Sequence, residues 1–134
     1  MPLIHWFHLF RTEILQFKNA PSFNQNLYWN TVKVTEMSNM FEDADAFDGD
    51  VSTFNISNVL YLQMMFRNAI SFTGKPDLSS WDFSNVQDAR EMFYGAVSFQ
   101  GFGISFWNIT SLQIPNLMVR IFGYVLNGIE QLYD

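Results

Sequence analysis

The chain contains no cysteine. Disulfides, thiol catalysis and cysteine-based zinc sites are therefore excluded. Basic residues are also scarce, with seven Lys and Arg against 13 Asp and Glu, which gives a formal net charge of −6. Binding to nucleic acid is not expected, because it needs basic patches that replace the counterions of the phosphates.

The chain also lacks a long apolar run. No stretch reaches the ~18 residues that a membrane-spanning helix needs, so no membrane span is expected. The first 15 residues, MPLIHWFHLFRTEIL, are apolar, but they lack a basic start and are interrupted by Arg11 and Glu13. We do not interpret them as a signal peptide. Either the protein is not exported by that route, or this chain is a piece of a longer one.

Histidine is nearly absent. His5 and His8 are the only two, and a metal site built on them would need a third ligand, for which Glu13 is the one candidate. Packing or surface roles fit these histidines better than metal binding. The sequence predicts no metal, no cofactor and no catalytic residues, and we expect the protein not to be an enzyme.

Aromatic residues are abundant. They form 18% of the chain and include 15 Phe, whereas charged residues form only 15%. A disordered chain shows the opposite balance. We therefore expect a folded chain in which the rings take specific places.

The rings follow an internal repeat. The segments FKNAPSF (17–23), FEDADAF (41–47), FRNAISF (66–72) and FYGAVSF (93–99) share one template, and their starts are 24, 25 and 27 residues apart. Internal repeats of this length indicate stacked structural units. The template has a first Phe, an Ala and a second Phe, which are Phe17, Phe41, Phe66 and Phe93; Ala20, Ala44, Ala69 and Ala96; and Phe23, Phe47, Phe72 and Phe99.

A second block follows each template. It opens on an aromatic residue, and a Met follows that residue after 11 positions each time. The span between the template and the next aromatic residue varies, so each unit has a constant half and a loop half of variable length. The aromatic residues are Trp29, Phe54, Trp81 and Trp107, and the Met residues are Met40, Met65, Met92 and Met118.

These periods predict an α/β repeat solenoid of the leucine-rich-repeat type, with about four coils. Residues 59–69 have helical spacing, with Ser57 and Ser84 as helix N-caps. Short strands are expected around Leu27, Val51, Leu78 and Ile104, after turns at Gly49, Gly74 and Gly101. We expect three parts: a degenerate coil or cap (1–16), the repeats (17–112) and a C-terminal cap or off-template tail (113–134), where Pro115 interrupts the pattern.

The repeat resembles the BspA-like leucine-rich repeats of bacterial surface proteins and lipoproteins. WDFSNVQDAREMFYGAVSFQ (81–100) is similar to the unit of that family, and so are residues 54–72 and 22–41. The resemblance covers residues 17 to about 112. It implies a location at the cell surface or outside the cell, and a role in adhesion.

Two motifs allow more than one interpretation. The acidic run 42–50 contains Glu42, Asp43, Asp45, Asp48 and Asp50, which could bind calcium, but Phe47 stands where a ligand belongs, and a solvated face explains the run better. Asn55-Ile-Ser57 and Asn108-Ile-Thr110 are glycosylation sequons. They occupy equivalent repeat positions with Asn30 and Asp82, so a shared turn or capping role is favoured.

Two functions fit these observations. The first is a non-catalytic surface module that binds a protein or glycan partner through outward positions of the loop half. The second is a structural spacer, or a truncated fragment of a longer array with no binding role of its own. In either case the apolar ends of the stack could associate end to end.

Overall fold

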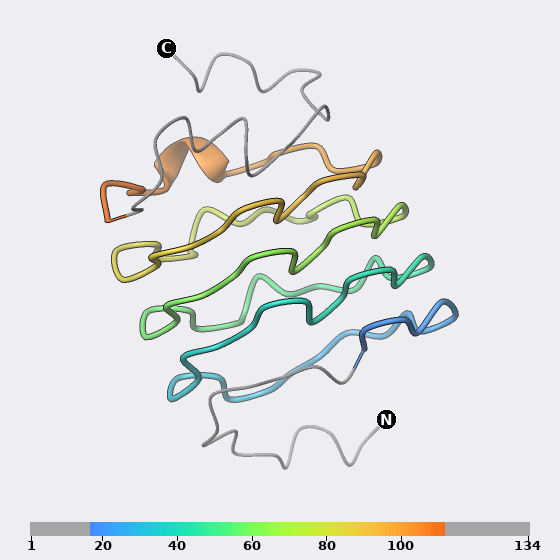
Figure 1. Cartoon of the computed structure of the whole chain (residues 1–134), viewed down its shortest axis with the longest axis horizontal. Helices are drawn as coiled ribbons and strands as arrows, with labels where there is room; N and C mark the ends of the chain where they lie inside the picture. The colour runs from blue at the N-terminus through green and yellow to red at the C-terminus, as the bar shows by residue number, and fades with distance from the viewer. Residues whose placement is uncertain (1–16, 112–134) are drawn as a thin grey trace.

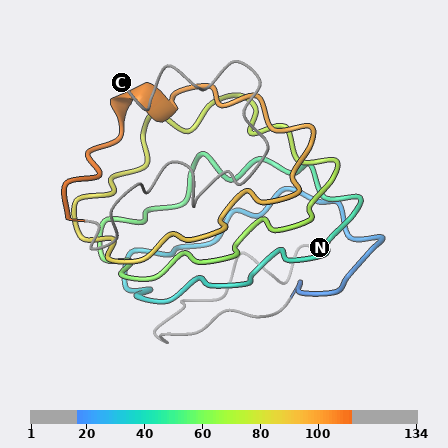
Figure 2. The same ribbon diagram turned by 45° about the horizontal axis from the view of Figure 1, so that its top comes forward.

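The computed structural model describes residues 17–111, and in this part of the chain the four repeats lie on top of one another (Figure 1). We define coil 1 as residues 17–34, coil 2 as 35–59, coil 3 as 60–86 and coil 4 as 87–111. Each complete coil crosses the front of Figure 1, turns at a tip on the right, returns behind and turns again on the left. Figure 2 shows the coils as flattened loops around one interior.

The α/β architecture expected from the sequence is wrong. Within residues 17–111 the one regular element is η2, a 3₁₀ helix over Ile104–Phe106. Two isolated parallel bridges join described residues in extended conformation, one between Glu36 and Tyr61 and one between Tyr61 and Asp88. Residues 59–69 form turns and not a helix, and the strands expected around Leu27, Val51, Leu78 and Ile104 are absent.

The reason lies in where the backbone N–H groups point. In an α-helix each N–H donates to a carbonyl four residues earlier in the same segment. Here alternate N–H groups of the front segments donate to the next coil instead. In coil 2 the N–H groups of residues 37, 39, 41 and 43 donate to the carbonyls of residues 61, 63, 65 and 67, at 2.8–3.1 Å. In coil 3 those of residues 62, 64, 66 and 68 donate to residues 88, 90, 92 and 94, at 2.8–2.9 Å.

The peptide units of coil 3 that take part are therefore each bonded to both neighbouring coils. The unit joining Met65 to Phe66 accepts a hydrogen bond at its carbonyl from Phe41 in coil 2 and donates its N–H to Met92 in coil 4. Four peptide units of coil 3 are arranged in this way. All their carbonyls point toward the N-terminal coils and all their N–H groups toward the C-terminal coils. Inter-coil bonds thus join the coils at alternate residues along the front of residues 17–111 without forming a strand.

Left-handed backbone conformations make this alternation possible. Positive φ angles recur at equivalent positions of the front segments, at Asn39 (63°), Met64 (59°) and Glu91 (55°). A second equivalent set lies directly before each template Ala, at Asn19, Asp43, Asn68 and Gly95, with φ of 57–76°. Residues in this conformation cannot continue a right-handed helix. Asn, Asp and Gly tolerate it best, and three of the four repeats supply Asn or Asp at the second set.

We predict that Glu91→Asn raises the free energy of unfolding by about 0.5–1 kcal/mol. Glu91 holds a left-handed backbone at φ 55°, which costs a residue other than Gly or Asn about 1 kcal/mol. The equivalent residue of coil 2 is Asn39, whose φ is 63°. The measurement is urea unfolding. Glu91→Gln is the matched control, because it removes the charge and keeps the strain, so it should change stability little. A gain as large for Gln as for Asn would assign the effect to charge.

The position of η2 has a local cause. In coils 2 and 3, Asp50 and Asp77 accept hydrogen bonds from the N–H and hydroxyl of Ser52 and Ser79, and these bonds close a tight turn. In coil 4 the equivalent residue is Gly103, which has no side chain to cap the turn and a φ of 86°. The backbone there winds into a short 3₁₀ helix instead.

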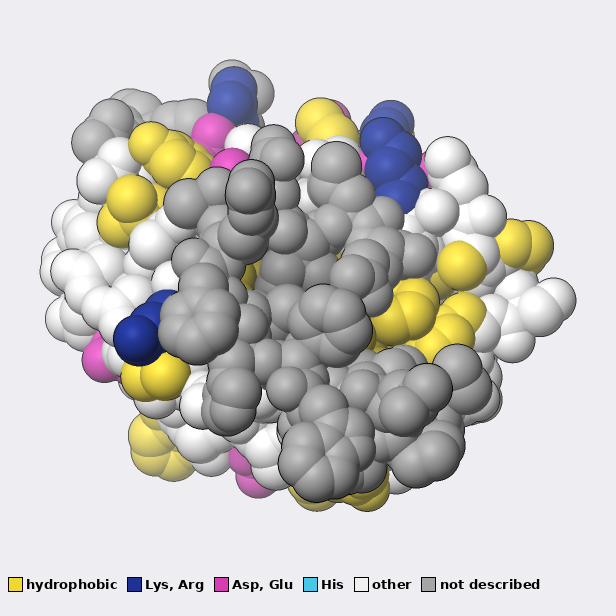
Figure 3. Space-filling view, turned by 90° about the horizontal axis from the view of Figure 1, so that it is seen from below, with side chains coloured by type: hydrophobic (Ala, Val, Ile, Leu, Met, Phe, Trp, Pro, Cys, Tyr) yellow, Lys and Arg dark blue, Asp and Glu magenta, His cyan; other side chains and the backbone are white. Residues whose placement is uncertain are grey.

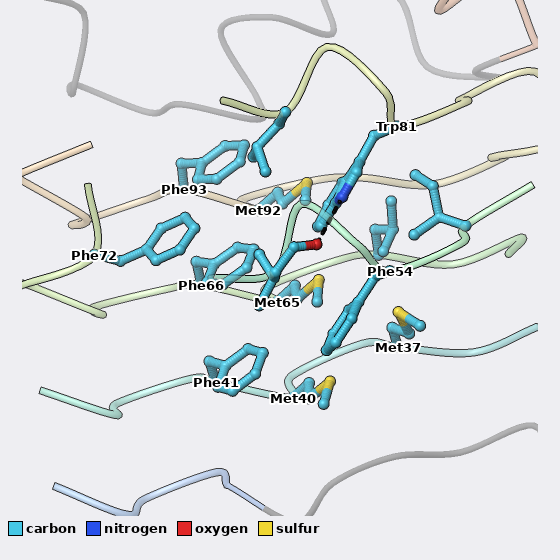
Figure 4. Packing of buried hydrophobic residues seen from close by; sticks show 14 of the residues in the cluster. Met37, Met40, Phe41, Phe54, Met65, Phe66, Phe72, Trp81, Met92 and Phe93 are labelled. Carbon is cyan, nitrogen blue, oxygen red and sulfur yellow. Dashed lines mark hydrogen bonds between the residues drawn. The ribbon is translucent and has the colours of Figure 1, made fainter. Parts of the chain in front are cut away.

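The core consists of the repeated apolar residues (Figure 4). Phe66 is fully buried, with its ring centroid 5.3 Å from that of Phe41 below it and 5.6 Å from that of Phe93 above it. Within its own coil, Phe66 stacks on Phe72 at 4.0 Å. Offset stacked rings attract one another beyond their burial. The two Phe positions of each template therefore form two parallel columns of rings through the stack.

Candidate interaction surface

The residues singled out from the repeat lie mainly in the core. The first Phe column consists of Phe17, Phe41, Phe66 and Phe93, and successive rings are 5.3–5.6 Å apart. The second consists of Phe23, Phe47, Phe72 and Phe99, at 5.7–6.0 Å. Met40, Met65 and Met92 are fully buried, as are Ala44, Ala69 and Ala96, whereas Ala20 is partly exposed. Met118 lies outside the described residues.

The aromatic residues that open the second block are also buried, namely Trp29, Phe54, Trp81 and Trp107. Two of the indoles join coils through hydrogen bonds. Trp81 Nε1 donates to the Val51 carbonyl at 3.1 Å (Figure 4), and Trp107 Nε1 donates to the Leu78 carbonyl at 2.8 Å. A buried indole N–H needs such a partner. These residues therefore hold the stack together and do not face a ligand.

The acidic run 42–50 does not form a calcium cage. Within residues 17–111 no group of three or more His, Cys, Asp and Glu side chains is placed to hold a metal ion. Most of the acids bind neighbouring groups instead. Asp43 Oδ1 accepts from Asn68 Nδ2 at 2.9 Å, and Asp48 Oδ1 accepts from the N–H and hydroxyl of Thr73 at 2.8 and 2.7 Å. His5, His8 and Glu13 lie outside the described part of the chain.

Glu42 is the buried member of the run. Its carboxylate joins three coils, with Lys18 Nζ of coil 1 at 3.0 Å, Arg67 NH1 of coil 3 at 3.3 Å, and Asn39 Nδ2 of its own coil at 2.7 Å. Burial raises the pKa of the Glu42 carboxyl, but the hydrogen bonds from Asn39, Lys18 and Arg67 and the charge of Lys18 outweigh it. The pKa is therefore held below its ordinary value.

A carboxyl whose pKa is lower in the folded than in the unfolded chain stabilises the fold above its unfolded pKa. This stabilisation is lost as pH falls through the folded pKa, which lies below the ordinary value of 4.5. We predict that Glu42→Gln lowers the free energy of unfolding by about 2 kcal/mol at pH 7, because it leaves charged partners unpaired. The difference from the wild type should shrink below pH 4 in urea unfolding curves. Asp45→Asn, at an exposed position, should show no such pH dependence.

The sequons lie at the left-hand turns of Figure 1, where Asn or Asp caps each turn. Asn55 Oδ1 accepts from the N–H and hydroxyl of Ser57 at 2.9 and 2.6 Å, and Asp82 does the same with Ser84. Asn108 and Thr110 repeat the arrangement in coil 4. This geometry is the Asx turn, and it accounts for Asn, Asp, Ser and Thr at these positions without a glycan. Ser57 and Ser84 thus serve the turns and not helix N-caps.

Each right-hand tip presents one outward residue, and that residue differs from coil to coil. Each tip lies between the buried template Ala and the second Phe, and one residue projects directly after the Ala. We define the tip edge as these residues, which are Pro21, Asp45, Ile70 and Val97. All four are exposed, with Ile70 at 46% and Val97 at 64%.

Four aromatic side chains of the described residues are exposed, and the sequence pattern did not single them out. They are Tyr28 at 63%, Tyr61 at 37%, Phe102 at 45% and Phe106 at 76%. Phe102 lies two residues before η2 and Phe106 is the last residue of η2, both in the loop half of coil 4. The equivalent residues of coil 3 are Pro76 and Ser80. Comparing the loop halves position by position would have identified both rings as departures from the repeat.

Comparison with known families decides which group of proteins this chain is part of. The profile of the family described as "Mycoplasma protein of unknown function, DUF285" matches residues 14–125, which is most of the chain. The chain belongs to the DUF285 family. The assignment to BspA-like leucine-rich repeats is therefore wrong, and the leucine-rich-repeat solenoid is also contradicted by the absence of a repeated strand and helix in residues 17–111. The surface location and adhesive role implied by that resemblance lose their basis.

No curated protein and no solved structure matched this member of DUF285. Within the described residues, no helix is long and apolar enough to cross a membrane. The geometry of the stack and its exposed side chains are therefore the features that bear on the function of the protein.

Proposed function

We propose that this DUF285 chain is a non-catalytic module that binds a protein partner. The observation that carries the proposal is the contrast between constant and variable positions at the tips. The flanking Ala and Phe are identical in all four repeats and pack in or against the core, whereas the projecting residue changes from Pro21 to Asp45, Ile70 and Val97. A constant scaffold that presents varied side chains in a row is how repeat proteins bind partners.

The use of the polar side chains supports this proposal. Asn58 Nδ2 donates to the Val32 carbonyl and Asn85 Nδ2 to the Ser57 carbonyl, both at 2.7 Å, so these side chains join one coil to the next. Glu42 and Asp48 also act between coils. In the described residues, the charged and polar groups thus serve mainly to hold the stack together. The exposed side chains of Ile70 and Val97 carry no polar group and make no such hydrogen bond.

The alternative is a spacer that holds other domains apart, and the regular stacking of the coils favours it. Affinity capture separates the two functions. The full chain is immobilised and exposed to cell extract, and captured proteins are quantified with and without excess free chain. A binding module should retain a protein that free chain displaces with a saturable dose dependence. If no captured protein responds to free chain, the binding function is wrong and the spacer remains.

A further inference from the structure

The exposed apolar residues of the tip edge form one strip. Ile70 and Val97 occupy equivalent positions of coils 3 and 4, directly after the buried Ala69 and Ala96. Adjacent coils are about one ring spacing apart, 5.6 Å between Phe66 and Phe93. Two aliphatic side chains projecting at this separation lie next to each other. Figure 3 shows the molecule from below, where hydrophobic side chains stand among uncharged ones at the right-hand end.

In coil 2 the tip edge carries an acidic residue. Asp45 of coil 2 takes the position of Ile70 and Val97, and Asp43 and Asp48 lie close to it in the chain. Four ion pairs occur among residues 17–111, and none of them involves these three carboxylates. Their negative charge is therefore not neutralised by a neighbouring Lys or Arg of the described chain. A partner that covers this end of the strip must bring a cation, because an apolar or acidic group would be repelled or left unpaired.

The spacing of the coils matches one particular secondary structure. Ring centroids of successive coils are 5.3 Å apart between Phe41 and Phe66, and 5.6 Å apart between Phe66 and Phe93. The pitch of an α-helix is about 5.4 Å. A helix lying parallel to the stack axis would place one side chain per turn opposite each coil. Residues at positions i, i+4 and i+7 of that helix would then meet three successive tips.

We propose that the tip edge binds an amphipathic α-helix of a partner protein. Two aliphatic residues on successive turns of that helix pack against Ile70 and Val97. A Lys or Arg on the next turn pairs with Asp45, in the field of Asp43 and Asp48. This proposal deepens the binding function proposed above and rests on it, since it names the surface and the chemistry of the partner.

The test uses the full chain and a synthetic helical peptide of about 18 residues, long enough for five turns. The peptide carries Lys, Leu and Leu at i, i+4 and i+7, with Ala and Gln at the other positions, and binding is measured by fluorescence anisotropy. Ile70→Ser and Val97→Ser should each weaken binding about tenfold or more. Phe106→Ser is the matched control, because Phe106 is an exposed ring outside the tip edge, and it should leave the affinity unchanged.

A charge exchange makes the assignment specific. Asp45→Lys should weaken binding of the Lys peptide, and a peptide with Glu in place of that Lys should bind the Asp45→Lys chain and not the wild type. Any of three results would overturn the tip-edge proposal. Phe106→Ser could weaken binding as much as Ile70→Ser or Val97→Ser, or the Glu peptide could fail to bind the Asp45→Lys chain. The Lys peptide could also fail to bind the wild type at millimolar concentration. The binding function itself would survive these results if affinity capture retained a partner equally with wild type and Val97→Ser. The binding function would be wrong together with the tip-edge proposal only if affinity capture also retained no partner that free chain displaces.

Discussion

Replacing Phe66 by Ala is expected to lower the free energy of unfolding by about 3–5 kcal/mol, the range for removing a buried Phe ring. Phe66 is fully buried and stacks on four other rings, with centroids 4.0–6.4 Å away: Phe41, Phe72, Trp81 and Phe93. Its loss leaves a cavity that opens onto both neighbouring coils. Single domains have only about 5–15 kcal/mol of stability, so the variant should be close to unfolding at room temperature. Urea unfolding followed by tryptophan fluorescence measures the change.

Two further variants show whether the effect belongs to the ring column. Phe23→Ala removes a ring that is only partly buried and stacks on Phe17 and Phe47, so a smaller loss is expected. Asp45→Ala, at an exposed tip, should change stability by less than about 0.5 kcal/mol. Equal losses in all three variants would mean that stability does not depend on position in the stack, and the packing account would be wrong.

Gly103→Ala is the second substitution with a large expected effect, a loss of about 2–4 kcal/mol. Two costs combine at this site. The backbone has a φ of 86°, where a side chain adds strain of about 1 kcal/mol or more. A Cβ would also lie 2.4 Å from the backbone nitrogen of Ser79 and 2.9 Å from its Cα, in the coil below. Because those atoms are backbone, coils 3 and 4 must separate, at the cost of overpacking.

Gly103→Asn separates the two costs. Asn tolerates a left-handed backbone but carries the same Cβ as Ala, so it should recover only the conformational part, about 1 kcal/mol. Thermal unfolding of the wild type and both variants gives the comparison. Full recovery by Asn would show that contact with Ser79 costs nothing, which would contradict the close approach of the two coils.

The period of the structure could be predicted from the sequence, whereas its secondary structure could not. Phe41, Phe66 and Phe93 stack in the order in which they occur, because a residue repeated once per coil falls at the same place in every coil. The apolar spacing of residues 59–69 is compatible with a helix but does not require one. Val59, Leu62, Met65 and Phe66 point inward from a segment of turns just as they would from a helix.

A local signal for the true backbone was present. The residue before each template Ala is Asn19, Asp43, Asn68 or Gly95, and these are the residue types that best tolerate a left-handed backbone. A helix would have favoured Leu, Glu or Lys at some of these positions. The exposed pair Phe102 and Phe106 could not be assigned a surface position from the period alone, because coil 4 departs from the other coils at Gly103.

The shared peptide units of the front segments give the stack an electric dipole along its axis. Each peptide carries a dipole of about 3.5 D. In the units that join Met37, Asn39, Phe41 and Asp43 to coil 3, and in their successors that reach coil 4, every carbonyl faces the N-terminal coils. The dipoles of these units add, although the N–H groups of Leu60, Gln87 and Gln100 donate in the opposite direction and offset part of the sum. A net dipole along residues 17–111 favours head-to-tail over head-to-head alignment of two such stacks, and a head-to-tail interface builds rings or open filaments and not twofold dimers.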